Sequence, residues 1–415
     1  MCISGLGRSL LYQNQGDGTL RALSPEAFPT SGWGTAVACG DIDRDGFPDV
    51  LLTRYTDWSP ASDVACRNYQ GIRDLCGPTS YRGTTSLLLH NSADGTFADW
   101  TERAGVTHEV RGLGVVALDL NDDGWVDFFV ASDESPNRVY LGGPTLPFTE
   151  SAELMGVAQG EWGGPQGSMG VGVADYNHDG LLDLFITNFE NEDDSLYRNM
   201  GNGLFMHGSA AAGLSGQTRM RVGFGTAFAD FDHDGWPDVF VLNGNTSYST
   251  GQSPFRQFPQ LFRNLHGRRF ADVSPQGGSF FRDIHAGRGA AVGDLDNDGA
   301  LDLVTVQIND PVQILANQHE RARYVAVLLV ARYGEREGIG ARVWFEQGTQ
   351  RETQFVTRGT GFFSQSDPRL FFSVPAEHKG VTVTVAWPGR QTESFQNLPT
   401  NGTVVLIEGK GQARE

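Results

Sequence analysis

One nine-residue pattern, with aspartate at positions 1, 5 and 9, recurs five times in this chain. Position 3 is aspartate or asparagine, and position 6 is always glycine, which permits a sharp turn. Alternating carboxylates ahead of such a turn suit Ca²⁺, because this ion takes six to eight oxygen ligands. The pattern therefore predicts five calcium loops: DIDRDGFPD (41–49), DLNDDGWVD (119–127), DYNHDGLLD (175–183), DFDHDGWPD (230–238) and DLDNDGALD (294–302).

The predicted ligands are the side chains at positions 1, 3, 5 and 9 of each loop. Position 7 would add a backbone carbonyl, and the aspartate at position 9 would close the cage. About five Ca²⁺ ions are expected. The side-chain ligands are Asp41, Asp43, Asp45, Asp49, Asp119, Asn121, Asp123, Asp127, Asp175, Asn177, Asp179, Asp183, Asp230, Asp232, Asp234, Asp238, Asp294, Asp296, Asp298 and Asp302.

The loops begin like EF-hands but do not continue like them. An EF-hand closes with glutamate at position 12 between two helices. Here a strand-like apolar run follows each glycine, and position 12 is Leu52, Val130, Ile186, Val241 or Thr305. Each loop is therefore predicted to join two strands.

The loops recur at intervals of 78, 56, 55 and 64 residues, and each repeat predicts four strands. Four-stranded units at this period are blades of a β-propeller. A pair of glycines precedes each loop, which predicts innermost strands that crowd the propeller axis. The pairs are 32/34, 112/114, 170/172, 223/225 and 287/289.

The first and fourth repeats carry insertions, and the chain begins within a blade. Residues 10–24 match strands three and four, with no metal loop before them, so we expect a partial N-terminal blade. A polar insertion lies at 55–85 and a smaller one at 243–259. The first insertion holds Cys66 and Cys76, for which we expect a disulfide and an oxidising compartment.

The formal net charge is −19, and the loops account for nearly all of it, since their ligands include eighteen aspartates. Five Ca²⁺ ions would bring the charge to about −9. An acidic chain of this kind argues against nucleic acid as a partner.

No segment approaches the ~18 apolar residues of a membrane span. The first residues do not form a signal peptide. Two localisations stay open: extracellular or periplasmic if a leader is missing, and cytoplasmic if Met1 is the true start.

The glycine-rich strand, the D-x-D-x-D-G-x-x-D loop and the apolar strand resemble the FG-GAP/VCBS repeat of integrin alpha-chain propellers, over about 10–318. Residues 338–348, 359–372 and 383–390 are similar to the ASPIC/UnbV domain, which follows such repeats in cartilage-acidic-protein-like proteins. The cysteine-containing insertion resembles bacterial members. The resemblance implies a calcium-bound propeller (1–318) and a small β-domain (319–415), mostly secreted or periplasmic, with no settled activity.

The residue pattern of 319–415 also predicts a small β-domain independently of the family resemblance. It reads as six or seven short strands with glycine, proline and asparagine between them, which is typical of a sandwich or a barrel. After SQSDPRL the chain continues FFSVP, where the family often has a histidine and a turn, so a role tied to that turn is in doubt.

If strands alternate in direction, the metal loops share one face of the propeller and the longer connections share the other. Binding residues often lie on such connections. The alternative for each is an ordinary solvated loop residue. The second face would gather Trp58, Tyr69, His108, Arg111, Trp162, Arg219, Arg221, Asp283, His285 and Arg288.

Two functions follow from this arrangement. The first is a calcium-stabilised binding or adhesion module whose second face takes a glycan or a protein. The second is an enzyme, a lyase or cyclase that uses a metal loop with an open position or the second face. In that case Arg111, Asp283 and His285 are the acid–base candidates. Chelation tests the first hypothesis, and alanine substitutions test the second.

Overall fold

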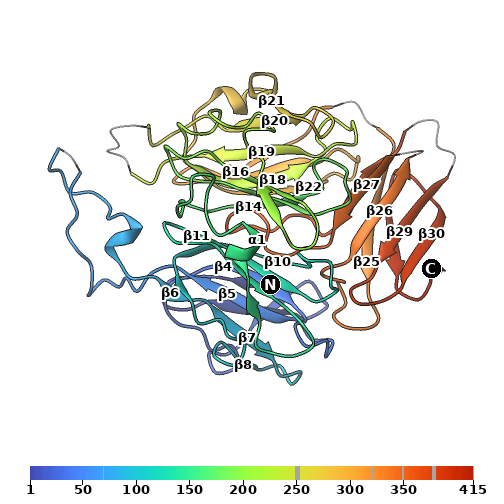
Figure 1. Cartoon of the computed structure of the whole chain (residues 1–415), viewed down its shortest axis with the longest axis horizontal. Helices are drawn as coiled ribbons and strands as arrows, with labels where there is room; N and C mark the ends of the chain where they lie inside the picture. Colours follow the sequence, from blue (N-terminus) through green and yellow to red (C-terminus); the bar gives the residue numbers. More distant parts are fainter. Residues whose placement is uncertain (69, 248–252, 320–321, 348–349, 376–379, 415) are drawn as a thin grey trace.

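A computed structural model of the chain describes residues 1–68, 70–247, 253–319, 322–347, 350–375 and 380–414. The described part is almost entirely β-structure (Figure 1). The prediction of an all-β chain built from four-stranded blades and a second β-unit is confirmed.

Four antiparallel sheets contain four strands each, in chain order from the inside outward. In every one, the first two strands flank a predicted metal loop. The sheets are β4 (Gly34–Gly40), β5 (Asp49–Arg54), β7 (Leu87–Asn91) and β8 (Phe97–Asp99); β10 (Gly112–Leu118), β11 (Asp127–Ser132), β12 (Arg138–Leu141) and β13 (Thr149–Glu150); β14 (Val171–Ala174), β15 (Asp183–Ile186), β16 (Ser195–Asn199) and β17 (Phe205–His207); and β18 (Gly223–Ala229), β19 (Asp238–Asn243), β20 (Gln260–Asn264) and β21 (Phe270–Asp272).

Two further blades have three strands each. The N-terminal one confirms the predicted partial blade, since β2 and β3 occupy the segments expected for strands three and four. The sheets are β1 (Cys2–Ile3), β2 (Leu10–Asn14) and β3 (Leu20–Ala22), and β22 (Gly287–Gly293), β23 (Asp302–Gln307) and β24 (Gln313–Leu315).

Short elements fill the connections between the blades. Among the described residues, two strands pair outside the blades, and one short α-helix and three 3-10 helices occur. They are β6 (Thr84–Thr85) with β9 (Glu109–Val110), α1 (Ala152–Met155), η1 (Pro78–Ser80), η2 (Ser274–Gln276) and η3 (Phe280–Arg282).

The inner strands approach one another closely, which explains their paired glycines. A Cβ atom on Gly114 would lie 2.3 Å from the carbonyl oxygen of Met169, and one on Gly170 would lie 2.1 Å from that of Phe224. The second strands carry the apolar cores between blades, and all six residues of β11 and of β19 are buried. Larger residues at the glycines would force neighbouring blades apart.

The C-terminal unit consists of two sheets, as expected for a sandwich. Two of its strands, β30 and β32, escaped prediction, and β25 pairs with β31 in parallel. We keep the boundary at residues 318 and 319 as a proposal, between β24 and β25. The sheets are β28 (Leu370–Ser373), β25 (Tyr324–Val330) and β31 (Thr403–Ile407), and β27 (Gln350–Phe355), β26 (Arg342–Gln347), β29 (Val381–Ala386), β30 (Thr392–Leu398) and β32 (Gln412–Arg414).

One segment of the C-terminal unit, residues 358–367, runs among the inner strands of the propeller. Arg358 forms a bridge with Ala117 in β10, and Gly361 forms one with Val171 in β14. The amide of Asp367 donates to the carbonyl oxygen of Val292 in β22 (2.8 Å). We call residues 358–367 the axial segment.

Candidate calcium loops and an aromatic pocket

All five metal loops have the same backbone conformation. The residue at position 4 has a positive φ in each loop, between 55° and 61°, and the glycine at position 6 has a φ between 81° and 95°. The large positive φ at position 6 favours glycine, which explains why all five loops have glycine there. The residues at position 4 are Arg44, Asp122, His178, His233 and Asn297.

The carboxylates at positions 1 and 9 fix each loop through backbone amides. In the third loop, Oδ1 and Oδ2 of Asp175 accept the N–H groups of positions 5 and 6, at 3.0 and 2.9 Å. Asp183 accepts from position 2 and from the end of the third strand, where the donor is the amide of Asn199 (2.7 Å). The other four loops repeat this pattern, so the oxygen atoms are directed by the fold itself.

The oxygen donors fit a hard cation. Carboxylate oxygens of three predicted ligands lie within 4.8 Å of one another in the first, fourth and fifth loops. These groups are Asp41, Asp43 and Asp49; Asp230, Asp232 and Asp234; and Asp294, Asp296 and Asp302. In the second and third loops the side-chain oxygen at position 3, from Asn121 and Asn177, accepts the amide N–H of position 5. These oxygen donors suit Ca²⁺ better than a softer metal. In the first loop a ring nitrogen of His90 also lies within 4.8 Å of carboxylate oxygens of Asp43 and Asp45.

Burial makes these carboxylates costly to ionise without a counter-charge. It raises the pKa of Asp119, Asp175 and Asp230 to about 7, and it raises the pKa of Asp127 and Asp183 well above the ordinary range. Neighbouring carboxylates act in the same direction, and the backbone amides oppose it. A divalent cation in each loop would offset this repulsion.

The raised pKa values predict opposite pH dependences with and without calcium. In EDTA the folded state binds more protons than the unfolded state between about pH 4 and 7, so its stability falls as the pH rises. Each such carboxyl contributes roughly 1 kcal/mol per pH unit. With calcium the ligands must be ionised, so stability rises over the same range. Melting curves at pH 5.5 and 8, each recorded in EDTA and in calcium, check this. A melting temperature that changes with pH in the same direction under both conditions would contradict the prediction.

His178, at position 4 of the third loop, packs against the neighbouring loop. Its ring stacks on Trp236, the residue at position 7 of the next loop, with centroids 3.8 Å apart. In the same way the guanidinium of Arg44 lies over the ring of Trp125. In these two pairs of loops, position 4 of one loop packs on position 7 of the next.

The C-terminal unit lies on the face that carries the metal loops. Ser373 donates to Oδ2 of Asp230 (2.6 Å), and Arg342 pairs with Asp122 (3.1 Å). A Cβ atom on Gly124 would lie 2.4 Å from the amide nitrogen of Gly389.

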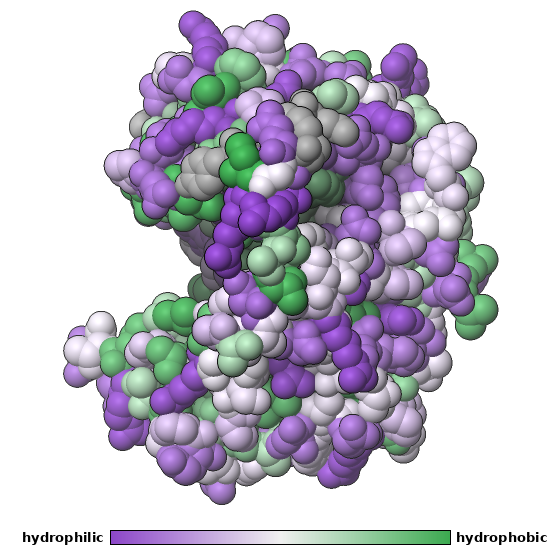
Figure 2. All heavy atoms as spheres, turned by 90° about the vertical axis from the view of Figure 1, so that its left-hand side faces the viewer, coloured by the Kyte–Doolittle hydropathy of each residue, from purple (hydrophilic) through white to green (hydrophobic). Residues whose placement is uncertain are grey.

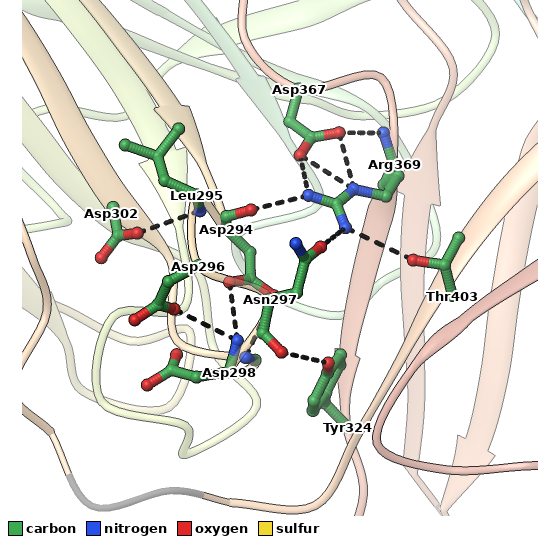
Figure 3. A network of polar contacts seen from close by, with 11 residues as sticks. Asp294, Leu295, Asp296, Asn297, Asp298, Asp302, Tyr324, Asp367, Arg369 and Thr403 are labelled. Atoms are coloured by element: carbon green, nitrogen blue, oxygen red, sulfur yellow. Dashed lines mark hydrogen bonds and ion pairs between the residues drawn. The ribbon is translucent and has the colours of Figure 1, made fainter.

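Arg369 holds the fifth loop against the C-terminal unit (Figure 3). Its guanidinium donates to the carbonyl oxygen of Asp294 (2.8 Å) and to Oδ1 of Asn297 (2.8 Å), and it also pairs with Asp367. Tyr324 donates to the carbonyl oxygen of Asn297 (3.4 Å). The order of this loop and the docking of the unit therefore depend on each other.

The structure does not bring the three acid–base candidates into contact. Arg111 donates to the carbonyl oxygens of Tyr81 and Glu134. His285 is 5% exposed, and its Nε2 lies 2.9 Å from the carbonyl oxygen of Phe280, on whose ring it stacks. Asp283 is exposed at the end of η3. Within the described ranges, no contact joins Arg111 to the other two.

The remaining residues of the predicted second face have ordinary local partners. Arg221 donates to the carbonyl oxygen of Phe258, and Arg288 donates to that of Asn245. The carbonyl of Arg219 accepts from Asn191, and His108 lies against Tyr140. Trp162 is 89% exposed, and Tyr69 lies outside the described residues.

An aromatic pocket lies where the insertion at 55–85 meets the first blade. Its cavity is about 500 Å³, and its aromatic walls are Trp33, Tyr55, Trp58 and Tyr81. The ring of Trp33 lies 5.2 Å from that of Tyr55 and 5.5 Å from that of Trp58. The cluster is only partly buried, so its rings are available to a ligand.

Asp63 organises the polar side of this pocket. It accepts hydrogen bonds from Trp58 Nε1 (3.0 Å) and from the hydroxyl of Tyr81 (3.0 Å), which lower the pKa of its carboxyl. Arg73 pairs with its second oxygen (3.2 Å). At the rear, the hydroxyl of Tyr55 donates to Asp133, a carboxyl whose pKa burial raises to about 6.

The structure joins Cys66 and Cys76 in a disulfide that closes the insertion beside the pocket. Asp74 accepts a hydrogen bond from the hydroxyl of Ser247, so the insertions of the first and fourth repeats meet across the second face. Figure 2 shows the side on which the first insertion projects, where the surface is indented and mixes hydrophilic and hydrophobic residues.

Sequence reasoning named Trp58 but missed Trp33, Tyr55, Tyr81 and Asp63. The available signal was the density of aromatic residues at both ends of the polar insertion. Trp33 precedes β4 and Tyr81 lies near the end of the insertion, so only the folded blade brings them together.

Family models match most of the chain. The model described as FG-GAP-like repeat matches residues 1–52, 119–186, 175–241 and 230–305, which together exceed half of the sequence. The model described as ASPIC and UnbV matches residues 332–413. The predicted resemblance is confirmed by both matches.

The curated relatives include cartilage acidic protein 1 of Mus musculus, 24% identical over 366 residues, and that of Homo sapiens, 28% identical over 366 residues. The matches cover 86% of this chain in both cases, and 51% and 50% of the relatives. The chain therefore spans about half the length of the curated relatives it matches.

The solved structures that match this chain have low sequence identity to it. They include the Dos1 propeller (TM-score 0.38, 8% identity, 90% of this chain and 86% of that one) and Trypanosoma rangeli sialidase (0.38, 9%, 95% and 80%). An Agrocybe aegerita lectin that recognises terminal N-acetylglucosamine scores 0.33, with 15% identity over 76% of this chain and 90% of that one. Among the described residues, no helix is long and apolar enough to cross a membrane.

Proposed function

The chain belongs to the FG-GAP-like repeat proteins that carry an ASPIC and UnbV domain, and we propose that it is a calcium-stabilised, extracellular or periplasmic binding module for a glycan. The calcium loops hold the blades and the C-terminal unit in place. The opposite face presents the aromatic pocket. The disulfide of the insertion supports an oxidising compartment.

The aromatic pocket is the observation that carries this proposal. Sugar rings present C–H groups on their faces, and these pack on the electron-rich faces of tryptophan and tyrosine. Sugar hydroxyls at the ring edge need charged or polar partners, which Asp63 and Arg73 supply at the pocket wall. A cavity of about 500 Å³ is within the usual size of a small-ligand site. The pocket therefore suits one or two sugar residues better than a flat protein surface.

Binding is favoured over catalysis because the acid–base candidates have separate partners. The described residues show no contact between Arg111 and either Asp283 or His285. The carboxyl of Asp63 is committed to three donors within the pocket. These separate partners favour the binding module over the lyase or cyclase alternative.

The test uses the full chain, loaded with calcium, on a glycan array and in titrations with the best glycan. Trp58→Ala removes one aromatic wall and should weaken binding about 30-fold, because a buried aromatic contact of this kind is worth about 2 kcal/mol. Trp162→Ala is the matched control, since this tryptophan is 89% exposed and does not line the pocket. Equal binding by the two variants would refute the assignment of the pocket, and capture of no glycan would refute the ligand class.

A further inference from the structure

One position at the end of the third strand, close to the calcium loop, is occupied by different residues in the five repeats. In every loop, Oδ1 of the position 9 aspartate accepts the amide at the end of the third strand, at 2.7 to 2.8 Å. The donors are Asn91, Gly142, Asn199, Asn264 and Asn317. The residue before each donor therefore occupies one equivalent position, and these residues are His90, Leu141, Arg198, Arg263 and Ala316.

Two of these residues are arginines that reach the predicted calcium ligands. In the fourth loop, Nε of Arg263 lies 2.6 Å from Oδ2 of Asp232, and its NH2 lies 3.0 Å from Oδ2 of Asp234. In the third loop, NH2 of Arg198 lies 3.2 Å from Oδ2 of Asp179. The guanidinium of Arg263 is therefore bonded to carboxylates at positions 3 and 5, and that of Arg198 to the carboxylate at position 5.

The second loop lacks this partner because its equivalent residue is Leu141. Its position 3 amide donates to the carboxylate of Asp123 (2.9 Å), as the amide of Asn177 does to Asp179 in the third loop (2.9 Å). The nearby Arg44 donates to the carbonyl oxygen of Gly124 and lies over the ring of Trp125. The third and fourth loops thus each have a ligand carboxylate bonded to a guanidinium from this equivalent position, whereas the second loop has Leu141 there.

We infer that Arg198 and Arg263 are positioning residues that make the third and fourth loops weaker calcium sites than the second loop, and that hold these two loops in shape without metal. A divalent cation attracts the same carboxylates as the guanidinium and is repelled by it. The arginine must therefore lose part of its bonding when the ion binds. Without the ion, it neutralises carboxylates that would otherwise repel one another. This inference rests on the proposed calcium sites.

The arginine side chains are partly exposed, so solvent screens these effects. The side chain of Arg263 is 45% exposed and that of Arg198 is 40% exposed. Exposed ion pairs contribute modestly, and we therefore expect a change of roughly fivefold in the calcium affinity of one loop for each arginine.

The experiment compares Arg263→Leu with wild-type protein in two measurements. Chelator competition should show one calcium site about fivefold tighter, whereas the melting temperature in EDTA should fall. Terbium luminescence sensitised by Trp236, at position 7 of the fourth loop, follows this site in a Trp125→Phe background. Arg198→Leu should act likewise on the third loop, and Leu141→Arg should weaken one site.

Arg282→Leu is the control, because it removes the same charge from an exposed 3-10 helix on the other face. A merely structural arginine would lower both calcium affinity and stability, so Arg263→Leu with unchanged or weaker calcium binding overturns the inference. Failure of wild-type protein to take up calcium at all would instead refute the proposed calcium loops.

Discussion

Chelation of calcium is expected to lower the melting temperature of the protein more than any single substitution considered above. Each ion bound at 100 times its Kd would add about 2.7 kcal/mol to the free energy of unfolding. Five such contributions are comparable to the whole stability of an ordinary domain, which is about 5–15 kcal/mol. Without the ions, buried carboxylates in the loops would also repel one another. Scanning calorimetry in calcium, in EDTA and after calcium is restored measures the effect.

A pair of aspartate substitutions separates metal binding from turn formation. Asp183 is fully buried at position 9 of the third loop, whereas Asp94 is exposed in a turn and accepts the amide and hydroxyl of Thr96. Asp183→Asn should lower the melting temperature in calcium and change it little in EDTA. Asp94→Asn should change neither. An identical melting temperature of wild-type protein with and without EDTA would remove the structural role of calcium.

The calcium loops were predictable because everything that shapes them is local. Nine consecutive residues supply the ligands, the turn and most of the hydrogen bonds, as in the amides that Asp175 accepts from positions 5 and 6. The period of the loops then predicts the blades. The crowded inner strands follow from the paired glycines, whose missing side chains leave space for the next blade.

The docking of the C-terminal unit was not predictable from such patterns. Ser373 contacts Asp230 across 143 residues of chain, and neither residue carries a sign of the other in its local sequence. The aromatic pocket was not predicted for the same reason, since Trp33 and Tyr81 belong to different elements. Arg111 and His285 looked like a pair only because strand alternation assigns both to one face, which leaves their separation on that face undetermined.

The axial segment gives the second large prediction, that Gly359→Ala will detach the C-terminal unit from the propeller. Gly359 has a φ of 95°, and a Cβ atom there would lie 2.2 Å from the carbonyl oxygen of Val115 and 3.1 Å from Cβ of Ala38. The first obstacle is backbone, so no rotamer change relieves it. Backbone strain adds about 1–2 kcal/mol for a residue with a side chain. Together with overpacking of about 1–3 kcal/mol, the free energy of unfolding should fall by about 2–5 kcal/mol.

Gly409→Ala is the matched control, because Gly409 lies in the same unit with a φ of 77° and no atom within 4 Å of its would-be Cβ. Alanine at this position would have the same positive-φ backbone strain but no steric clash with a neighbouring atom. Denaturant unfolding measures the difference in free energy, and limited proteolysis near residues 316–323 should cleave the Gly359 variant faster. Equal stability and equal cleavage of the two variants would show that the axial segment does not anchor the unit. If the segment does anchor it, the contacts of Ser373 and Arg369 with the loops are lost together with it, so calcium binding and docking should weaken in the same variant.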